Sequence, residues 1–210
     1  MISNILKKIY ETGVISIIRG VDQRFLKETL DALYSGGVDC VEITMNTAGA
    51  ISMIEKAKEL YSDKMLIGAG TVLEEVSARD AILAGADFIL SPVLNVKMIE
   101  MCSLYSKLAV PGVFTPSEVL TAKVAGAQLI KVFPVSVVGP QYIKDLLGPL
   151  DNLNLLPVGG VSEKNVRDYV KAGAFAVGIG SSLVNKGAVE RGDFEGIRIR
   201  AKEIVRQVER

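Results

Sequence analysis

The apolar positions of this chain fall into short uninterrupted runs, separated by longer segments in which apolar and polar residues mix. The runs are rich in β-branched residues and do not alternate with polar positions, which is typical of parallel strands covered on both faces. The predicted strands are Val14–Ile18, Cys40–Ile43, Met65–Ile67, Phe88–Leu90, Leu108–Val110, Leu129–Phe133, Leu155–Val158 and Ala176–Ile179.

The segments between these runs carry apolar residues at helical spacing. They predict helices over Phe25–Leu33, Ile51–Leu60, Val96–Leu104 and Val166–Val170, and a short amphipathic helix within residues 1–12. Two helix starts have their own signal: Thr115-Pro116-Ser117-Glu118 predicts a capping box with proline in the first turn, and Ser162 before Glu163 predicts another cap.

A weak repeat marks the joints between helix and strand. Gly37, Gly85, Gly126 and Gly173 each follow a helical segment and precede a strand, at the position where a left-handed residue ends a helix. Such repeated joints indicate equivalent βα units, and eight of them in 210 residues predict a (β/α)8 barrel with a short N-terminal helix. No linker divides the chain, so residues 1–210 are predicted to be one domain.

A doubly wound open sheet is the alternative fold. It would place a G-x-G-x-x-G turn after the first strand, and the sequence Arg19-Gly20-Val21-Asp22 does not supply one.

Composition restricts the chemistry. The chain has 24 Lys+Arg, 24 Asp+Glu and a net charge of +0, which argues against a broad surface for nucleic acid or anionic membrane. It has no histidine, which excludes Ser-His-Asp and Cys-His nucleophile systems and histidine-ligated zinc. We therefore expect neither a metal nor another cofactor.

The cysteines and the mean hydropathy indicate the setting of the protein. Cys40 and Cys102 are far apart in sequence and form no C-x-x-C motif, so we expect a reducing cytoplasm and no disulfide. No apolar run reaches the length of a membrane span. A mean hydropathy of +0.34 indicates a core buried on both faces of the sheet, with subunit contacts as a further contribution.

Polar residues at the carboxyl ends of barrel strands point into the active-site mouth. Lys131 interrupts the apolar run Leu129–Phe133, where a charged amine is costly unless it is paired or neutral. In one interpretation its ammonium reaches solvent at the barrel rim. In the other, burial lowers its pKa from about 10.4, where only about one lysine in 2,500 is neutral at pH 7, and makes it a Schiff-base nucleophile.

Glu42 interrupts Val41-Glu42-Ile43 in the same way. It is either one partner of a structural ion pair with Lys131 or Arg19, or the carboxylate that moves protons beside an imine-forming lysine.

Small residues follow the last two strands, where barrels commonly bind phosphate. Gly159 and Gly160 follow one strand, and Gly180, Ser181 and Ser182 follow the next. Because glycine lets main-chain N–H groups approach phosphate oxygens, these segments predict a phosphate site.

Seven motifs occur along the chain in the order found in one enzyme family. They are Ile18-Arg19-Gly20, Val41-Glu42-Ile43-Thr44, Ile67-Gly68-Ala69-Gly70-Thr71-Val72, Leu90-Ser91-Pro92, Pro111-Gly112-Val113-Phe114-Thr115-Pro116, Ile130-Lys131-Val132-Phe133-Pro134 and Gly159-Gly160-Val161. Together they resemble the class I aldolases that act on 2-keto-3-deoxy-6-phosphogluconate and 4-hydroxy-2-oxoglutarate, over about residues 14–183.

The resemblance implies a (β/α)8 barrel, usually trimeric, that splits a 4-hydroxy-2-oxo acid to pyruvate and an aldehyde without a metal. It implies that Lys131 is the Schiff-base lysine and Glu42 the general acid/base. The implied substrate contacts are Arg19, Thr71, Thr44, Pro92 and Phe133, and the implied phosphate contacts are Gly159, Gly160, Gly180 and Ser181.

Two positions depart from the phosphogluconate type. Asn46 stands where many such members carry arginine, and Val158 stands where they carry threonine. Both are more similar to the relatives that cleave the galactonate epimer, which is therefore the alternative substrate.

Two other functions compete. An isomerase or epimerase acting on ribulose phosphates would use histidine and metal-binding acids, which the absence of histidine disfavours. A non-catalytic sugar-phosphate sensor would keep the glycines but has no need of Lys131 and Glu42 in an apolar interior.

Overall fold

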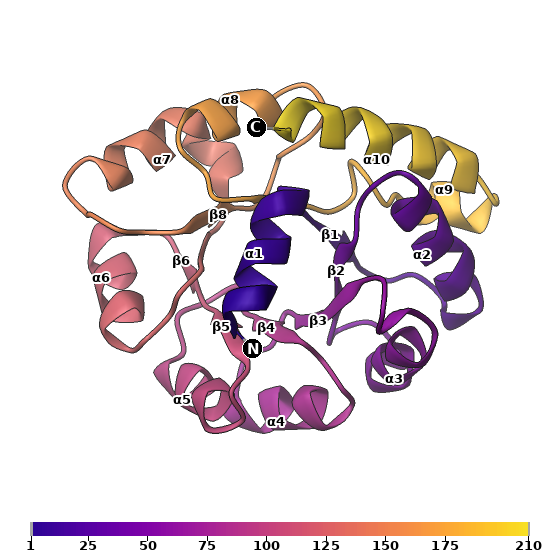
Figure 1. The fold of residues 1–210 in the computed structure, drawn as a ribbon, viewed down its shortest axis with the longest axis horizontal. Coiled ribbons are helices and arrows are strands. Elements are labelled where there is room, and N and C mark those ends of the chain that lie inside the picture. The colour runs from indigo at the N-terminus through magenta and orange to yellow at the C-terminus, as the bar shows by residue number, and fades with distance from the viewer. Residues whose placement is uncertain (1, 210) are drawn as a thin grey trace.

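The strands of the protein lie parallel in a barrel, and the helices surround them (Figure 1). The computed structural model describes residues 2–209. Each predicted strand is present, with ends that differ by a few residues, and this confirms the barrel over the doubly wound alternative. The strands are β1 (Val14–Ile18), β2 (Cys40–Thr44), β3 (Leu66–Gly70), β4 (Phe88–Leu90), β5 (Leu108–Val110), β6 (Gly112–Val113), β7 (Ile130–Val132), β8 (Leu155–Pro157) and β9 (Val177–Ile179).

Hydrogen bonding divides the barrel wall into a six-stranded sheet, β5-β4-β3-β2-β1-β9, and a three-stranded sheet, β6-β7-β8. At one junction the chain runs straight from β5 to β6 through Pro111, which has no N–H to donate and therefore interrupts a single barrel strand. At the other, the Phe175 N–H donates to the Leu155 carbonyl at 2.9 Å, and a parallel bridge joins Val158 to Gly178. Within residues 2–209, nine strand segments thus occupy the eight positions of the predicted barrel.

The helices follow the strands in the expected alternation. They are α1 (Ile2–Thr12), α2 (Leu26–Ser35), α3 (Ala50–Tyr61), α4 (Glu75–Leu83), α5 (Val96–Leu104), α6 (Pro116–Val124), α7 (Gly139–Leu147), α8 (Val166–Lys171), α9 (Lys186–Glu190) and α10 (Phe194–Val208), with short 3-10 turns at η1 (Gln23–Phe25) and η2 (Val135–Val137).

The local signals for helix ends are confirmed with one exception. The four joint glycines all have left-handed φ angles, between 90° and 100°. The Thr115 and Glu118 side chains form the predicted capping box of α6. The prediction for Ser162 is wrong: α8 begins later, and Ser162 instead forms a turn in which its N–H donates to the Asn165 side chain at 2.9 Å.

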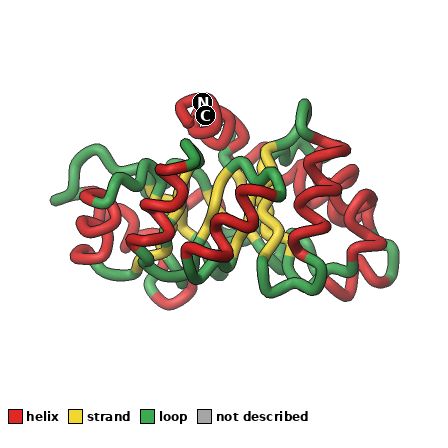
Figure 2. Tube along the Cα trace, turned by 90° about the horizontal axis from the view of Figure 1, so that it is seen from below, coloured by secondary structure: helices red, strands yellow, loops and turns green. Residues whose placement is uncertain are grey.

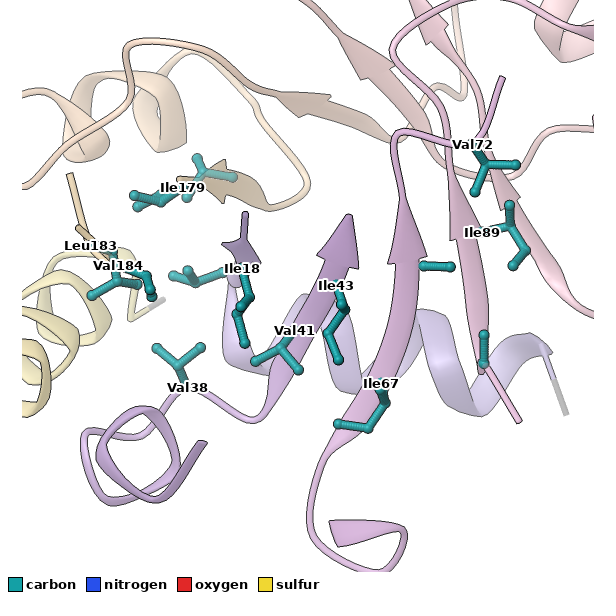
Figure 3. Packing of buried hydrophobic residues seen from close by; sticks show 14 of the residues in the cluster. Ile18, Val38, Val41, Ile43, Ile67, Val72, Ile89, Ile179, Leu183 and Val184 are labelled. Atoms are coloured by element: carbon teal, nitrogen blue, oxygen red, sulfur yellow. The ribbon is translucent and has the colours of Figure 1, made fainter. Parts of the chain in front are cut away.

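Two apolar layers line the barrel wall. Residues that point outward pack under the helices; Figure 3 shows part of this layer, with Ile18, Val41, Ile43, Ile67 and Ile89 on successive strands. Residues that point inward fill the barrel, among them Ile17, Phe88, Leu108, Leu156 and Val158. Each strand of this parallel sheet is therefore buried on both faces, which explains its non-alternating sequence.

Helix α1 covers the amino-terminal end of the barrel. Its Ile5 and Ile9 are buried against the inward-pointing layer, and Lys8 donates to the Lys64 carbonyl at 2.6 Å and pairs with Asp39 at 3.3 Å. Figure 2 shows α1 lying outside one end of the strands. The carboxyl ends of the strands, at the opposite end, are left to form a site.

Candidate active site

Lys131 lies at the centre of β7 and is only 2% exposed. Its Nζ atom lies 4.8 Å from the centre of the Phe133 ring. Burial lowers the pKa of the Lys131 amine; the carboxylate of Glu42 opposes this effect and the Arg19 guanidinium adds to it. The interpretation in which this ammonium reaches bulk water is therefore wrong, and the buried, more readily neutral amine remains.

Glu42 lies on β2 and is 0% exposed. Neither of its carboxyl oxygens has a hydrogen-bond partner, and no ion pair within 4.0 Å joins Glu42 to any residue in the described range 2–209. Burial raises the pKa of Glu42, while the positive charges of Lys131 and Arg19 lower it by a smaller amount. The structural ion pair considered from the sequence is thus absent, and the carboxyl group is close enough to feel both cations without being bonded to either.

Thr71 follows the end of β3 with a φ angle of +55°, a left-handed conformation that a β-branched residue rarely adopts. The Arg19 Nη2 atom donates to the Thr71 hydroxyl at 3.3 Å. Strained backbone of this kind persists where the surrounding structure enforces it, often at functional sites. The two residues predicted to hold the anionic ends of a substrate therefore lie side by side.

Thr44 and Pro92 have different surroundings. Thr44 is buried, and its hydroxyl lies 2.9 Å from that of Thr47, which accepts from the Gly20 N–H at 2.9 Å. Pro92 is half-buried, and its main chain packs against Gly112 so closely that a side chain at Gly112 would collide with it. These contacts join the loops that follow neighbouring strands. Substrate contact by Thr44 or Pro92 stays a prediction.

A cavity of about 340 Å³ opens at the carboxyl ends of β1, β8 and β9. It includes all four residues predicted to bind phosphate, together with Arg19 and Phe133. Lys131, Glu42, Thr71, Thr44 and Pro92 are not among its lining residues. The lining residues are Ile17, Arg19, Phe133, Val158, Gly159, Gly160, Val161, Ser162, Gly178, Gly180, Ser181, Ser182, Val184 and Lys186.

Phe133 connects the cavity to the buried amine, because its ring borders the cavity and lies beside Lys131. Gly159 and Gly160 both have left-handed φ angles, 97° and 80°. A Cβ atom at Gly160 would lie 2.8 Å from the Ser136 side chain, so this loop must pass the η2 turn without side chains. The structure thus brings the small residues after the last two strands into one wall, as the sequence predicts.

Lys186 is a cavity residue that sequence reasoning missed. It is the first residue of α9, and its Cδ atom would lie 3.9 Å from a Cβ at Gly20, in the loop that follows the neighbouring strand β1. It is exposed and makes a 3.8 Å ion pair with Glu190. An exposed lysine at a helix start looks ordinary in the sequence; its position shortly after Ser181, at the carboxyl end of a strand, is the signal that could have indicated it.

The two positions that depart from the phosphogluconate type differ in location. Asn46 is exposed and does not border the cavity. Val158 does border it, and a Cβ at Gly178 would lie 2.6 Å from the Val158 Cγ2 atom. Val158 therefore presents a methyl surface where a threonine would present a hydroxyl.

Within residues 2–209 there is no group of three or more Cys, Asp or Glu residues arranged to hold a metal ion. None of the helices in the same range has both the length and the apolar character needed to cross a membrane.

Comparison with known proteins gives a consistent result. The family profile described as KDPG and KHG aldolase matches residues 2–199. A 2-dehydro-3-deoxy-6-phosphogalactonate aldolase of Escherichia coli (strain K12) is 36% identical over 180 residues, 85% of this chain and 88% of that protein. A probable 2-dehydro-3-deoxy-6-phosphogalactonate aldolase of Rhizobium meliloti is 36% identical over 178 residues, 84% of each chain.

Among solved structures, a KDPG aldolase from Legionella pneumophila, captured with pyruvate as a covalent carbinolamine, superposes with a TM-score of 0.89. It is 26% identical, and the match covers 95% of this chain and 97% of that one.

Proposed function

Since the chain belongs to the KDPG and KHG aldolase family, we propose that it cleaves a 6-phosphorylated 2-keto-3-deoxy sugar acid at the carboxyl end of the barrel. It is a class I aldolase, a carbon–carbon lyase. The observation that carries the assignment of the site is the pair formed by Lys131 and Glu42, a buried amine and a buried, unbonded carboxyl group on facing walls of one apolar interior.

Lys131 is the nucleophile. Its neutral amine adds to the C2 ketone, and loss of water from the resulting carbinolamine gives an iminium ion. The C3–C4 bond then breaks, its electron pair moves into the iminium, and an enamine of pyruvate remains on Lys131. Protonation of the enamine at C3 and hydrolysis release pyruvate and the free amine. Burial supports this role because it favours the uncharged amine.

Glu42 moves the protons. It donates one to the leaving hydroxyl of the carbinolamine and accepts the proton of the C4 hydroxyl as the C3–C4 bond breaks. Burial raises the pKa of Glu42, which increases its protonated fraction and makes its ionised form a stronger proton acceptor, so the group can act in turn as acid and base. Because neither oxygen is hydrogen-bonded to protein, both are available to the substrate or to a water molecule.

The anionic ends of the substrate have separate places. Arg19 and Thr71 hold the carboxylate end, near the strained turn after β3. The phosphate lies in the wall formed by Gly159, Gly160, Gly180 and Ser181, with Lys186 at its edge. Glycine N–H groups can approach phosphate oxygens closely, which supports this arrangement.

The galactonate epimer is the preferred substrate in this proposal. Two relatives at 36% identity carry that activity in their names, and Val158 offers no hydroxyl to the cavity. The gluconate epimer is the second candidate, supported by a 2-dehydro-3-deoxy-phosphogluconate aldolase of Haemophilus influenzae that is 30% identical over 96% of this chain. 4-Hydroxy-2-oxoglutarate, which lacks a phosphate, is expected to be a poor substrate.

The test of the site is chemical trapping. The protein is incubated with pyruvate and borohydride, digested and analysed by mass spectrometry; a reduced pyruvyl adduct is expected on the peptide that contains Lys131, and none in Lys131→Ala. The Lys131→Ala variant should lose turnover by orders of magnitude. An unmodified Lys131 in a fully active enzyme would overturn the mechanism. A wild type that shows no turnover, together with a Lys131→Ala variant that still binds the sugar phosphate tightly, would instead indicate the non-catalytic sensor.

The test of the substrate is a comparison of kcat/KM for both epimers and for 4-hydroxy-2-oxoglutarate, with pyruvate as the measured product. A higher kcat/KM for the galactonate epimer is expected. A higher value for the gluconate epimer would replace the first candidate by the second.

We also propose that the enzyme is a homotrimer in a reducing compartment. Cys40 and Cys102 are free and buried, which suits a reducing setting. Leu73, Val76 and Val93 are 56%, 60% and 48% exposed, and the Asn95 side chain donates to the Leu73 carbonyl at 2.9 Å, which joins the loops after β3 and β4. In this proposal the three exposed apolar side chains form one contact surface. A head-to-tail contact that uses such a surface can close a ring of three.

Light scattering coupled to size exclusion tests the trimer. A mass three times 22.5 kDa is expected for the wild type and a smaller mass for Val76→Asp. The matched control Ile199→Asp, on α10 at the other side of the barrel, should keep the trimer (Figure 1). A monomeric wild type would refute the proposal.

A further inference from the structure

The last residue of β3, Gly70, lies on the face of the strand that is turned into the barrel. Gly70 pairs with Thr44 of β2 in the parallel register, and Gly68, two residues earlier on the same inward face, pairs with Glu42. Glycine in the interior of a strand weakens it, and often marks a place where another group approaches closely. Two glycines on one face of one strand therefore require a reason.

The backbone does not supply that reason for Gly70. Its φ angle is not among the left-handed ones, so an alanine could adopt the same conformation. The space above it is the constraint. A Cβ atom on Gly70 would lie less than 3.0 Å from both carboxyl oxygens and from the carboxyl carbon of Glu42. The carboxyl group of Glu42 thus rests against the bare α-carbon of Gly70.

No hydrogen bond or ion pair to another described residue holds that carboxyl group in place. Both of its oxygens lack hydrogen-bond partners within the described residues, and no ion pair within 4.0 Å anchors it. A glutamate has three side-chain torsions, and in this interior its position is set by shape. Gly68 shows the same device in a purely structural use, because the space above it is filled by the Phe88 ring.

We propose that Gly70 is a positioning residue for the aldol cleavage: its missing side chain creates the space that fixes the Glu42 carboxyl group, unbonded, inside the barrel. This inference rests on the role proposed above for Glu42. Gly70 does not touch the substrate; it acts through the carboxyl group that does.

The substitution Gly70→Ala should therefore displace a catalytic group without disrupting the fold. The atoms that the new methyl group would meet form the far end of a flexible side chain, which can move at little cost. Displacement of a reacting group by about 1 Å can lower a rate by about 100-fold. We expect kcat to fall by about 10- to 100-fold with KM changed by less than about threefold, and the limb of the pH–rate profile that reports Glu42 to shift.

Two control variants separate positioning from damage. Gly148→Ala is the matched control, since its φ angle is −62° and a Cβ there meets only ordinary contacts at 3.6 Å or more; wild-type kinetics are expected. Gly68→Ala forces a methyl group into the Phe88 ring and is expected to lower the thermal midpoint. Gly70→Ala is expected to keep the midpoint and lose kcat.

The decisive experiment is a double-mutant cycle with Glu42→Asp. The aspartate carboxyl group recedes by about 1.5 Å, one carbon–carbon bond, and so no longer meets a methyl group at residue 70. Glu42→Asp should lower kcat strongly in the wild-type background and much less in the Gly70→Ala background. Equal losses in both backgrounds, or wild-type kcat and pH profile in Gly70→Ala, would overturn the inference.

The variant Glu42→Gln distinguishes a failure of the positioning role of Gly70 from a failure of the proposed function. If Glu42→Gln keeps full activity, Glu42 is not the proton carrier and the function proposal falls at that point. If Glu42→Gln is inactive while Gly70→Ala is unaffected, only the positioning role of Gly70 is refuted.

Discussion

At the scale of single residues, burial acts on Lys131 and Glu42 in opposite directions. It lowers the pKa of the amine and raises that of the carboxyl group, so it favours the uncharged form of each. The site therefore holds two groups that can exchange protons with a substrate without first breaking an ion pair. The same burial has a cost in stability, because the unfolded chain would charge both groups in water.

Replacement of Lys131 by methionine should expose this cost. The unfolded lysine keeps its proton up to its ordinary pKa of 10.5, whereas the buried amine loses it at lower pH, so unfolding takes up a proton and wild-type stability rises with pH through that interval. Lys131→Met, of similar volume, should be more stable than wild type at pH 7, and the difference should shrink toward pH 10.5. Urea unfolding at pH 6, 8 and 10 measures it; a difference that is constant with pH would contradict the expectation.

The backbone of Thr71 is a second feature that lowers the stability of the folded protein at the proposed site. Its left-handed φ angle costs a non-glycine residue about 1–3 kcal/mol, and its hydroxyl accepts the bond from Arg19. Thr71→Gly should leave the free energy of unfolding unchanged or raise it by about 1 kcal/mol, since strain relief exceeds the added freedom of the unfolded glycine. It should raise KM for the sugar acid. Chemical denaturation and steady-state kinetics test the two effects, and a clear loss of stability would show that the strain argument is wrong.

At the scale of elements, α1 is part of the barrel core although it precedes the first strand. Ile9 is fully buried among residues that point into the barrel, at the end opposite the cavity. Ile9→Ala should destabilise the protein by about 2–5 kcal/mol, the usual cost of such a cavity. KM should not change, because no residue of α1 borders the cavity. Lys7→Ala, which changes an exposed residue of the same helix, is the control. A change in KM for Ile9→Ala would contradict the prediction, because it would show that packing of α1 affects substrate binding at the opposite end of the barrel.

The elements also show how far the sequence can lead. Strands and helices could be predicted because burial on both faces produces continuous apolar runs, and because the joints carry glycine. The split of one strand at Pro111 was not predicted, although the missing N–H of this proline is visible in the sequence; which sheet each half joins depends on pairing with other strands. The cap at Ser162 was misplaced because several residues near a helix start can accept a backbone N–H, and Asn165 takes part in that turn.

The same limit applies to the site. Lys131 and Glu42 could be singled out because a charge inside an apolar run is conspicuous. Lys186 had only a weak signal, its position shortly after Ser181 at the end of a strand. The role of Gly70 had none, because a strand glycine is ordinary until the side chain packed against it from the neighbouring strand is known.

At the scale of the whole molecule, the net charge of +0 gives no overall attraction for an anionic substrate, so the charges that border the cavity matter. Arg19 and Lys186 are the cationic side chains of the cavity. Lys186→Gln should raise KM for the phosphorylated substrate about fivefold, since a charge at about 4 Å in water contributes about 1 kcal/mol. kcat should stay unchanged, and the effect should diminish with added salt.

The control for this prediction is Lys171→Gln, an exposed lysine at the end of α8 that does not border the cavity. The unphosphorylated sugar acid is the control substrate, and its KM should not respond to Lys186→Gln. An equal rise in KM for both substrates would place Lys186 away from the phosphate.

The position of helix α1 has a consequence for substrate entry and product release. With the amino-terminal end of the barrel covered, the mouth at the strand termini serves both entry and exit. In the proposed mechanism only the aldehyde is unbound after cleavage, while the three-carbon fragment stays attached to Lys131. The aldehyde must therefore be released first, through the same opening by which the sugar acid enters. A high concentration of that aldehyde should favour the reverse reaction, condensation with the bound enamine.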